Sequence, residues 1–411
     1  MTSWLRSDSI PPTLLLHQRV IDDPYPFYAR LRREAPVWPV ADSRIFAAST
    51  FALVAEATGR VDDFSSNLHC LMYRDERGIP ARWDYGDGGG QALATADPPL
   101  HTLHRSAVFP ELVATRMSAL EPEILELATA GVTRALELGS FDFMAEIGNL
   151  IPITIISRLI GFQGSDVGKL LASAFETTAM LSCTLTLDDL IECIGRTTEI
   201  GKWIRAQLAV SMREPGEDLL GAVARSVHDD LMSEFEGYGI LHTLLSAGGE
   251  STTSLLGNAV RILAEDQDLQ TQLRDQPALI PTFIEEVLRL ESPFRYLMRS
   301  VRNDTTLGGV HIPAGSTVLL LWGAANHDEH EYEHPDTIDL QRTPPKHHLA
   351  FGRGIHFCVG APLARLEARI VLTALLERTT ALTLDPDRPA RWVHSLMIRR
   401  HEELPIQLVG Q

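Results

Sequence analysis

The sequence predicts a mainly α-helical fold with a small β-rich subdomain. Residues 111–213 carry apolar side chains at helical spacing almost throughout, with short glycine-containing breaks. No proline occurs between Pro215 and Pro277, which leaves room for one unusually long helix at about residues 230–264. Strand-like runs gather instead near residues 310–321 and close to the C-terminal end.

Composition and charge narrow the class of protein. Apolar residues make up 45% and charged residues 22% of the 411, an ordinary globular composition that can fill a large core. Acidic residues outnumber basic ones by 54 to 36, and the net charge of −18 argues against a general nucleic-acid or anionic-membrane binder. The four cysteines form no CxxC pair, the N-terminus lacks a signal-peptide profile, and no apolar run reaches the ~18 residues of a membrane span. We therefore expect a soluble, cytoplasmic monomer in which residues 1–411 form a single domain without a membrane anchor.

Shorter elements are expected at both ends of the chain. Residues 37–40 and 45–48 predict a short hairpin. Residues 62–96 have no regular pattern and predict a mobile loop. Near the C-terminus, residues 392–398 predict a hairpin turn whose return strand is residues 404–408.

A single cysteine lies in a glycine-rich run of ten residues, Phe351-Gly352-Arg353-Gly354-Ile355-His356-Phe357-Cys358-Val359-Gly360. Glycines permit backbone conformations closed to other residues and allow a flat ligand to come close. Arg353, His356 and the N-terminus of a helix predicted to follow would surround the sulfur with positive potential, which favours a thiolate. The alternative is a small buried hydrophobic residue, which is how most free cysteines behave.

The predicted long helix contains a polar segment, Ala247-Gly248-Gly249-Glu250-Ser251-Thr252-Thr253. Each glycine costs a helix about 1 kcal/mol relative to alanine, and an acid among hydroxyls is costly to bury without partners. One interpretation is a helix kink with a solvated Glu250. The other is a widened groove in which Glu250 and Ser251 relay protons, with Thr252 as a second choice because adjacent helical positions point about 100° apart.

The run at residues 351–360 resembles the Phe-Gly-x-Gly-x-His-x-Cys-x-Gly haem-binding loop of the cytochromes P450 at every defining position. Residues 97–105 are similar to the family's Asp-Pro-Pro-x-His-x-x-x-Arg motif, and residues 247–251 to its Ala-Gly-x-(Asp/Glu)-Thr oxygen-binding motif. Residues 286–289 match its Glu-x-x-Arg motif. The resemblance extends over about residues 20–410 and implies the cytochrome P450 fold, with haem b as the cofactor.

The resemblance assigns roles to individual residues. It implies that Cys358 is the axial thiolate ligand of the haem iron. It implies that His101, Arg105 and Arg299 reach the haem propionates, although by spacing alone His101 and Arg105 form an ordinary polar helix face. The other residues expected to contact the haem are Phe351, Gly352, His356, Gly360, Ala247 and Gly248.

Two positions depart from the family pattern. Ser251 stands where the family usually has threonine; it keeps the hydroxyl but loses the methyl group that restricts χ1. Glu286 and Arg289 match the family's buried structural pair, whose usual third member is an arginine near residues 335–339. Thr337 occupies that place in this chain.

The function implied is that of a haem-thiolate monooxygenase that inserts one oxygen atom of O2 into a hydrophobic small molecule of steroid, terpenoid or fatty acyl type. Electrons would come from NAD(P)H through a ferredoxin reductase and a ferredoxin, which would dock on a basic patch formed by Lys346, Arg353, Arg365 and Arg369. Two alternatives are a peroxide-driven haem-thiolate peroxygenase and a non-catalytic haem-thiolate ligand binder. The apolar residues expected to line the substrate pocket are Leu71, Met72, Met180, Leu181, Leu244, Leu297, Met298 and Leu396.

Overall fold

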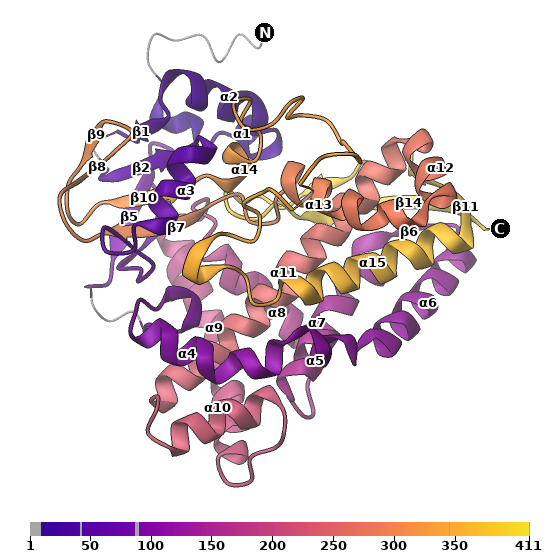
Figure 1. Ribbon diagram of the computed structural model, residues 1–411, viewed down its shortest axis with the longest axis horizontal. Helices are drawn as coiled ribbons and strands as arrows, with labels where there is room; N and C mark the ends of the chain where they lie inside the picture. The colour runs from indigo at the N-terminus through magenta and orange to yellow at the C-terminus, as the bar shows by residue number, and fades with distance from the viewer. Residues whose placement is uncertain (1–9, 42, 87–89, 345, 411) are drawn as a thin grey trace.

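The computed structural model describes residues 10–41, 43–86, 90–344 and 346–410. Helices form most of the molecule and strands gather in two regions at opposite sides of it (Figure 1). The longer helices are α2 (Tyr25–Glu34), α3 (Phe51–Gly59), α4 (Leu100–Val108), α6 (Glu121–Leu138), α7 (Leu150–Ile160), α8 (Val167–Ala179), α9 (Leu187–Ser211), α10 (Leu219–His228), α11 (Glu234–Glu265), α12 (Gln267–Asp275), α13 (Ile280–Leu290) and α15 (Ala361–Arg378). The shorter ones are α1 (Gln18–Asp22), α5 (Ala114–Ser118) and α14 (Trp322–Ala325). The predicted mainly α-helical fold with a smaller β part is confirmed.

Helix α11 is the predicted long helix and runs through the middle of the helical region (Figure 1). It begins at Glu234 rather than at about 230 because Ser233 caps it: the Ser233 hydroxyl accepts from the Glu236 amide at 3.2 Å, and the Glu236 carboxylate accepts from the Ser233 amide at 2.7 Å. Helices α7, α8, α9 and α15 pack around α11, and their apolar faces form the main hydrophobic core. The helix that carries the polar segment is therefore held on several sides.

The largest sheet has the strand order β1-β2-β10-β7-β3. It contains the predicted hairpin, since β1 (Val37–Pro39) pairs antiparallel with β2 (Ile45–Ala48). Its remaining strands are β10 (Thr317–Leu320), β7 (Leu297–Val301) and β3 (Phe64–Ser65). A second sheet, β11-β14-β6, lies near the C-terminus and consists of Thr379–Leu384, Pro405–Gly410 and Ser140–Asp142, respectively. Strands β8 (Thr305–Leu307) and β9 (Val310–Ile312) form a separate hairpin.

Residues 62–96 are not simply a loop, which corrects the prediction. Strand β4 (Cys70–Arg74) pairs with β5 (Pro80–Asp84) in an antiparallel hairpin, whereas residues 87–89 of that segment lie outside the described residues. The Arg82 guanidinium donates to the Gly315 carbonyl at 2.5 Å, and the Arg74 amide donates to the Leu185 carbonyl at 2.7 Å. The hairpin therefore bridges the β-rich region and the connection between α8 and α9.

The predicted C-terminal hairpin also has different strands. Strand β12 (Arg391–Trp392) pairs with β13 (His401–Glu403), so the return strand is not residues 404–408. Leu404 directly precedes β14, and residues 405–408 lie within that strand. Leu404 and Ile406 pack in the main core. Burial of these apolar side chains explains why the segment joins the second sheet and leaves the hairpin. No helix in the described part of the chain is long and apolar enough to cross a membrane.

Candidate functional site

The cysteine run forms a tight loop directly before α15. Gly352 and Gly354 adopt φ values of 67° and 71°, which side-chain-bearing residues rarely take, so glycine is required at both turns. The Cys358 amide donates to the Phe351 carbonyl at 3.0 Å and closes the loop. Helix α15 then begins at Ala361, so the sulfur lies at the N-terminus of an 18-residue helix.

Burial and positive potential act in opposite directions on the pKa of Cys358. Burial raises the pKa of the Cys358 thiol, and the backbone amides of Gly360 and Ala361, with Arg365 and Arg105, lower it by less. The positive surround that the sequence predicted is present, but desolvation outweighs it. A metal cation bound at the sulfur would lower this pKa and so favour the thiolate.

Beside this loop lies a cluster of basic side chains with unused hydrogen-bonding capacity. The rings of His101 and His356 are 4.2 Å apart between centroids, and the His356 Nε2 atom is buried without a partner among the described residues. Arg299 is 5% exposed. Among the described residues, its Nη1 atom donates to the carbonyl of the neighbouring Met298 at 2.8 Å. Burial lowers the pKa of Arg299 to about 10 and that of His356 to about 3. A buried, underpaired arginine beside free imidazole nitrogen is suited to an anionic ligand.

Arg105 is placed differently from the other predicted propionate ligands. Its Nη1 atom donates to the carbonyls of Ile355 and Phe357, each at 3.0 Å. It therefore ties α4 to the cysteine loop and keeps its other nitrogens for a further acceptor. Together, a loop sulfur and underpaired basic groups on three elements fit an iron porphyrin, which combines a soft-ligand metal with two carboxylates.

In α11, Glu250 is buried and fully engaged, so the solvated alternative is wrong. Its side chain is 1% exposed, its Oε1 atom accepts from Arg400 Nε at 2.8 Å, and its Oε2 atom accepts from the Thr178 hydroxyl. Burial raises the pKa of Glu250, while the positive charge of Arg400 and the hydrogen bonds from Thr178 and Arg400 oppose that rise. The Ser251 hydroxyl, half-buried one position on, donates to the Ala247 carbonyl at 2.6 Å, and Thr252 is buried.

The two glycines before Glu250 serve helix packing. A Cβ atom at Gly248 would lie 2.8 Å from Ile156 Cγ1, and one at Gly249 would lie 2.9 Å from Ile153 Cδ1. Both contacts are with α7, so the glycines allow α7 and α11 to approach closely, and α11 continues through them as an α-helix. Any contact of Gly248 with a cofactor must come from its backbone, because its side-chain direction faces α7.

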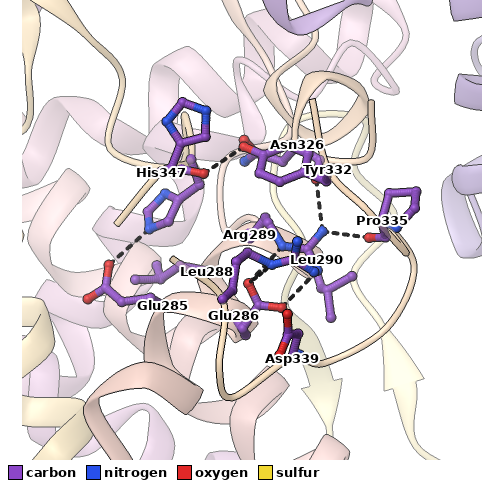
Figure 2. A network of polar contacts seen from close by, with 12 residues as sticks. Glu285, Glu286, Leu288, Arg289, Leu290, Asn326, Tyr332, Pro335, Asp339 and His347 are labelled. Atoms are coloured by element: carbon purple, nitrogen blue, oxygen red, sulfur yellow. Dashed lines mark hydrogen bonds and ion pairs between the residues drawn. The ribbon is translucent and has the colours of Figure 1, made fainter. Parts of the chain in front are cut away.

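The predicted pair of Glu286 and Arg289 is present, and its third member is Arg342. Arg289 donates twice to Glu286 at 2.9 Å and to the carbonyls of Asn326, Pro335 and Thr337, part of the network drawn in Figure 2. Arg342 Nε donates to Glu286 Oε1 at 2.9 Å. At the sequence level Thr337 left the triad in doubt; in the structure Thr337 contributes its carbonyl, and the arginine comes five residues later.

Five of the predicted substrate residues come together. Met72, Met298 and Leu396 belong to one buried apolar cluster, and Leu181 and Leu297 pack against it. The Leu396 amide donates to the Ser182 carbonyl at 3.0 Å, which fixes the C-terminal turn against the α8–α9 connection. The other three do not join this cluster: Leu244 belongs to the main core, and Leu71 and Met180 are partly buried elsewhere.

Sequence reasoning missed Thr178, Arg342 and Arg400. The available signal was indirect: a buried carboxyl needs partners, so both predicted glutamates called for donors. Nothing in the local sequence indicated which of the chain's basic residues would supply them.

The comparisons with known proteins agree with this architecture. The family model "Cytochrome P450" matches residues 258–403. "Cytochrome P450 144" of Mycobacterium tuberculosis is 38% identical over 388 residues, 94% of this chain and 89% of that protein. The "6-deoxyerythronolide B hydroxylase" of Saccharopolyspora erythraea is 32% identical over 401 residues, 94% of this chain and 96% of its own. The crystal structure of CYP109E1 from Bacillus megaterium in complex with testosterone superposes with a TM-score of 0.83 at 27% identity, covering 95% of this chain and 99% of that one.

Proposed function

Because this chain belongs to the cytochrome P450 family and is a P450 monooxygenase, we propose that it binds haem b with Cys358 as the axial ligand and oxidises a hydrophobic small molecule. The observation that carries the proposal is the group of basic side chains beside the cysteine loop that have few partners among the described residues, above all the buried Arg299 and the His356 Nε2 atom. Buried polar groups without partners are rare in folded proteins, and two haem propionates would satisfy these.

Different groups of residues would contact different parts of the cofactor. Arg299, His356 and His101 would bind the propionates from β7, the loop and α4, with Arg105 bracing the loop itself. Phe351, Gly352 and Gly360 shape the loop, and Ala247 and Gly248 would present the α11 backbone. Bound haem would supply the iron that activates O2, with the Cys358 sulfur donating electron density to it.

The chain's own part in the reaction is to deliver protons and orient substrate. The overall reaction, RH + O2 + 2 e⁻ + 2 H⁺ → ROH + H2O, needs two protons at the site of O2 reduction. The raised pKa of Glu250 brings this carboxyl closer to the operating pH, which suits a proton donor. The Ser251 hydroxyl would pass the proton on when it leaves the Ala247 carbonyl, with Thr252 as the second candidate.

For the substrate we propose a steroid, terpenoid or fatty acyl compound. The five clustered apolar residues from β4, β7, the α8–α9 connection and the C-terminal turn support an apolar binding region. The name of one similar structure points the same way, since it was solved with the steroid testosterone. Screening hydrophobic libraries for haem spin-state shifts tests this choice directly.

For the electron donor we propose a ferredoxin, reduced by an NAD(P)H-dependent reductase, which docks on the face that carries the cysteine loop. Lys346 and Arg353 are exposed there and have no ion-pair partner in the described chain. Lys346 also lines a groove of about 320 Å³ together with Arg365 and Arg369. Arg365 pairs with Glu285 at 2.6 Å and Arg369 with Glu121 at 2.9 Å, so the predicted patch keeps two of its four charges uncompensated. Reversing the charge of Lys346 and Arg353 should slow reduction of the haem by the ferredoxin, most strongly at low salt. If the variant and the wild type have the same reduction rate at every salt concentration, the ferredoxin does not dock on this patch.

The first experiment on the whole proposal is a carbon monoxide difference spectrum of the dithionite-reduced protein. A strongly red-shifted Soret band that disappears in Cys358→Ala supports the thiolate-ligated haem. A band at the shorter wavelength of neutral or imidazole ligation, or no haem at all, would overturn it. Turnover with NAD(P)H, reductase and ferredoxin, compared with peroxide, then separates a monooxygenase from a peroxygenase or a ligand binder. We place the enzyme in the cytoplasm as a monomer and treat residues 1–411 as one domain.

A further inference from the structure

The Glu250 carboxyl is restrained by two elements distant from it in the sequence. Its Oε1 atom accepts from Arg400, in the segment before β13, and its Oε2 atom accepts from Thr178, at the end of α8. In this arrangement the Ser251 hydroxyl is bonded to the Ala247 carbonyl and not to Glu250. Both carboxyl oxygens are therefore committed elsewhere in the conformation observed.

Arg400 is itself tightly placed. Its side chain is 8% exposed, and its guanidinium carbon lies 3.7 Å from the centroid of the Phe175 ring on α8. Its Nη1 atom donates to the His401 carbonyl at 3.2 Å. The planar group is thus fixed by an aromatic face, a carbonyl and a carboxylate, a combination that lysine cannot reproduce.

A polar stripe on α11 fixes the backbone that carries Arg400. Glu250, Ser254 and Asn258 recur at intervals of four residues and so share one face of the helix. The Ser254 hydroxyl and Asn258 Nδ2, the latter at 3.0 Å, both donate to the carbonyl of Arg399. Two hydrogen bonds therefore hold the residue before Arg400 against the same helix that carries Glu250.

The geometry points to Arg400 as a positioning residue for the proton-relay carboxyl: with the Thr178 hydroxyl, it holds Glu250 off Ser251 and so sets when Glu250 exchanges protons. This inference rests on the proposed function of Glu250 and extends it to two residues outside the family motifs. In the described chain, Arg400 is the one charged side chain whose interaction shifts the pKa of this carboxyl. From α8, Thr178 donates to this carboxyl and Phe175 packs against Arg400, and neither side chain carries a charge.

The test uses the haem-loaded protein and follows the protonated Glu250 carboxyl by infrared difference spectroscopy against pH, with the band assigned by its loss in Glu250→Gln. Thr178→Val keeps the side-chain shape and removes the hydroxyl, and Arg400→Met removes the charge. Thr177→Val is the matched control, because among the described residues the Thr177 hydroxyl bonds the Ser173 carbonyl and His242 Nε2 and not Glu250. Since Thr178 and Arg400 both lower this pKa, we expect the titration midpoint to move to higher pH in both variants, and to stay in place in Thr177→Val.

The same variants are then compared in turnover with a ligand that shifts the haem spin state. We expect Arg400→Met to lower product formed per NADPH by about 10-fold, with hydrogen peroxide as the alternative product, as for a misplaced catalytic group. An unchanged titration midpoint in Thr178→Val, or an equal movement in Thr177→Val, overturns the inference even if Arg400→Met fails to fold. Failure of the wild type to give a red-shifted Soret band would overturn the proposed function instead, and the infrared titration would still decide the role of Arg400.

Discussion

Two consecutive arginines near the C-terminus each bind a buried glutamate, and the two glutamates behave in opposite ways. Arg399 Nε donates to Glu291 Oε2 at 2.9 Å, and Arg400 Nε donates to Glu250 Oε1 at 2.8 Å. Burial by itself acts to raise the pKa of both carboxyls. At Glu291 the opposing interactions win and the pKa falls to about 2, whereas at Glu250 burial wins and the pKa is raised.

The difference lies in the number of cationic partners. Glu291 also accepts from Arg261 at 2.7 Å and from the Tyr25 hydroxyl at 2.5 Å, so two arginines and a phenol stabilise its charge. Glu250 has one arginine and one threonine hydroxyl. A buried carboxyl with two cations is a permanent anion that joins structural elements, whereas one with a single cation lies closer to the point at which it takes up a proton.

Arg399→Met tests the structural member of this comparison and should have the largest effect. We expect a loss of about 3–5 kcal/mol in the free energy of unfolding, because the substitution leaves a buried ionised carboxyl short of a partner. Urea denaturation measures it. The same substitution in a Glu291→Gln background should cost less, and an equal cost in both backgrounds would show that the ion pair is not the cause.

The pH dependence of stability should have opposite signs at the two sites. The folded-state pKa of Glu291 lies below its ordinary value of 4.5, so its contribution of about 3 kcal/mol is present above pH 4.5 and is lost as pH falls to about 2. The raised pKa of Glu250 makes its contribution greatest at low pH, and that contribution decreases as pH rises above 4.5. Unfolding curves for Glu291→Gln and Glu250→Gln, each subtracted from wild type across pH, check this; parallel difference curves would refute it.

Arg400→Met should destabilise the fold less than Arg399→Met. We expect a loss of about 1–3 kcal/mol, because the abandoned Glu250 carboxyl can become neutral by taking up a proton. Urea denaturation of the two variants at one pH gives the comparison. A loss as large as that of Arg399→Met would mean that Glu250 remains charged without its arginine, against the distinction drawn between the sites.

The smallest effect is expected from the glycines that set the position of Glu250. Gly248→Ala would bring a Cβ atom within 2.8 Å of Ile156 Cγ1, near the branch point of that side chain. We expect a net loss of about 1 kcal/mol, since overpacking at the α7–α11 contact exceeds the gain in helix propensity. Thermal unfolding of Gly248→Ala with and without Ile156→Ala, which removes Cγ1, checks the cause: the truncated side chain should restore part of the stability that Gly248→Ala loses. If it restores none, the contact with Ile156 is not responsible.

Several features that depend on local spacing follow from the order of the residues alone. The cysteine loop and the long helix follow from glycines and periodicity, and the resemblance to the family's Glu-x-x-Arg motif identified the pair of Glu286 and Arg289; the structure contains all three. The resemblance to the cytochrome P450 family rested on such local motifs, and a relative that matches 94% of this chain confirms it. Local patterns also predicted the first hairpin, whose strands are close neighbours in the chain.

Which side chains meet across long intervals depends on the folded arrangement of the whole chain. Arg400 is 150 residues from Glu250 in the sequence, and Arg342 is 56 residues from Glu286. Strand β14 pairs with β11 and β6 and not with the nearer strands β12 and β13. Whether Cys358 is a thiol or a thiolate depends in the same way on desolvation by the whole surrounding chain. Burial and charge compensation are sums over everything packed around a group, so they exist only after folding, whereas backbone geometry and helical spacing are already present in the order of the residues.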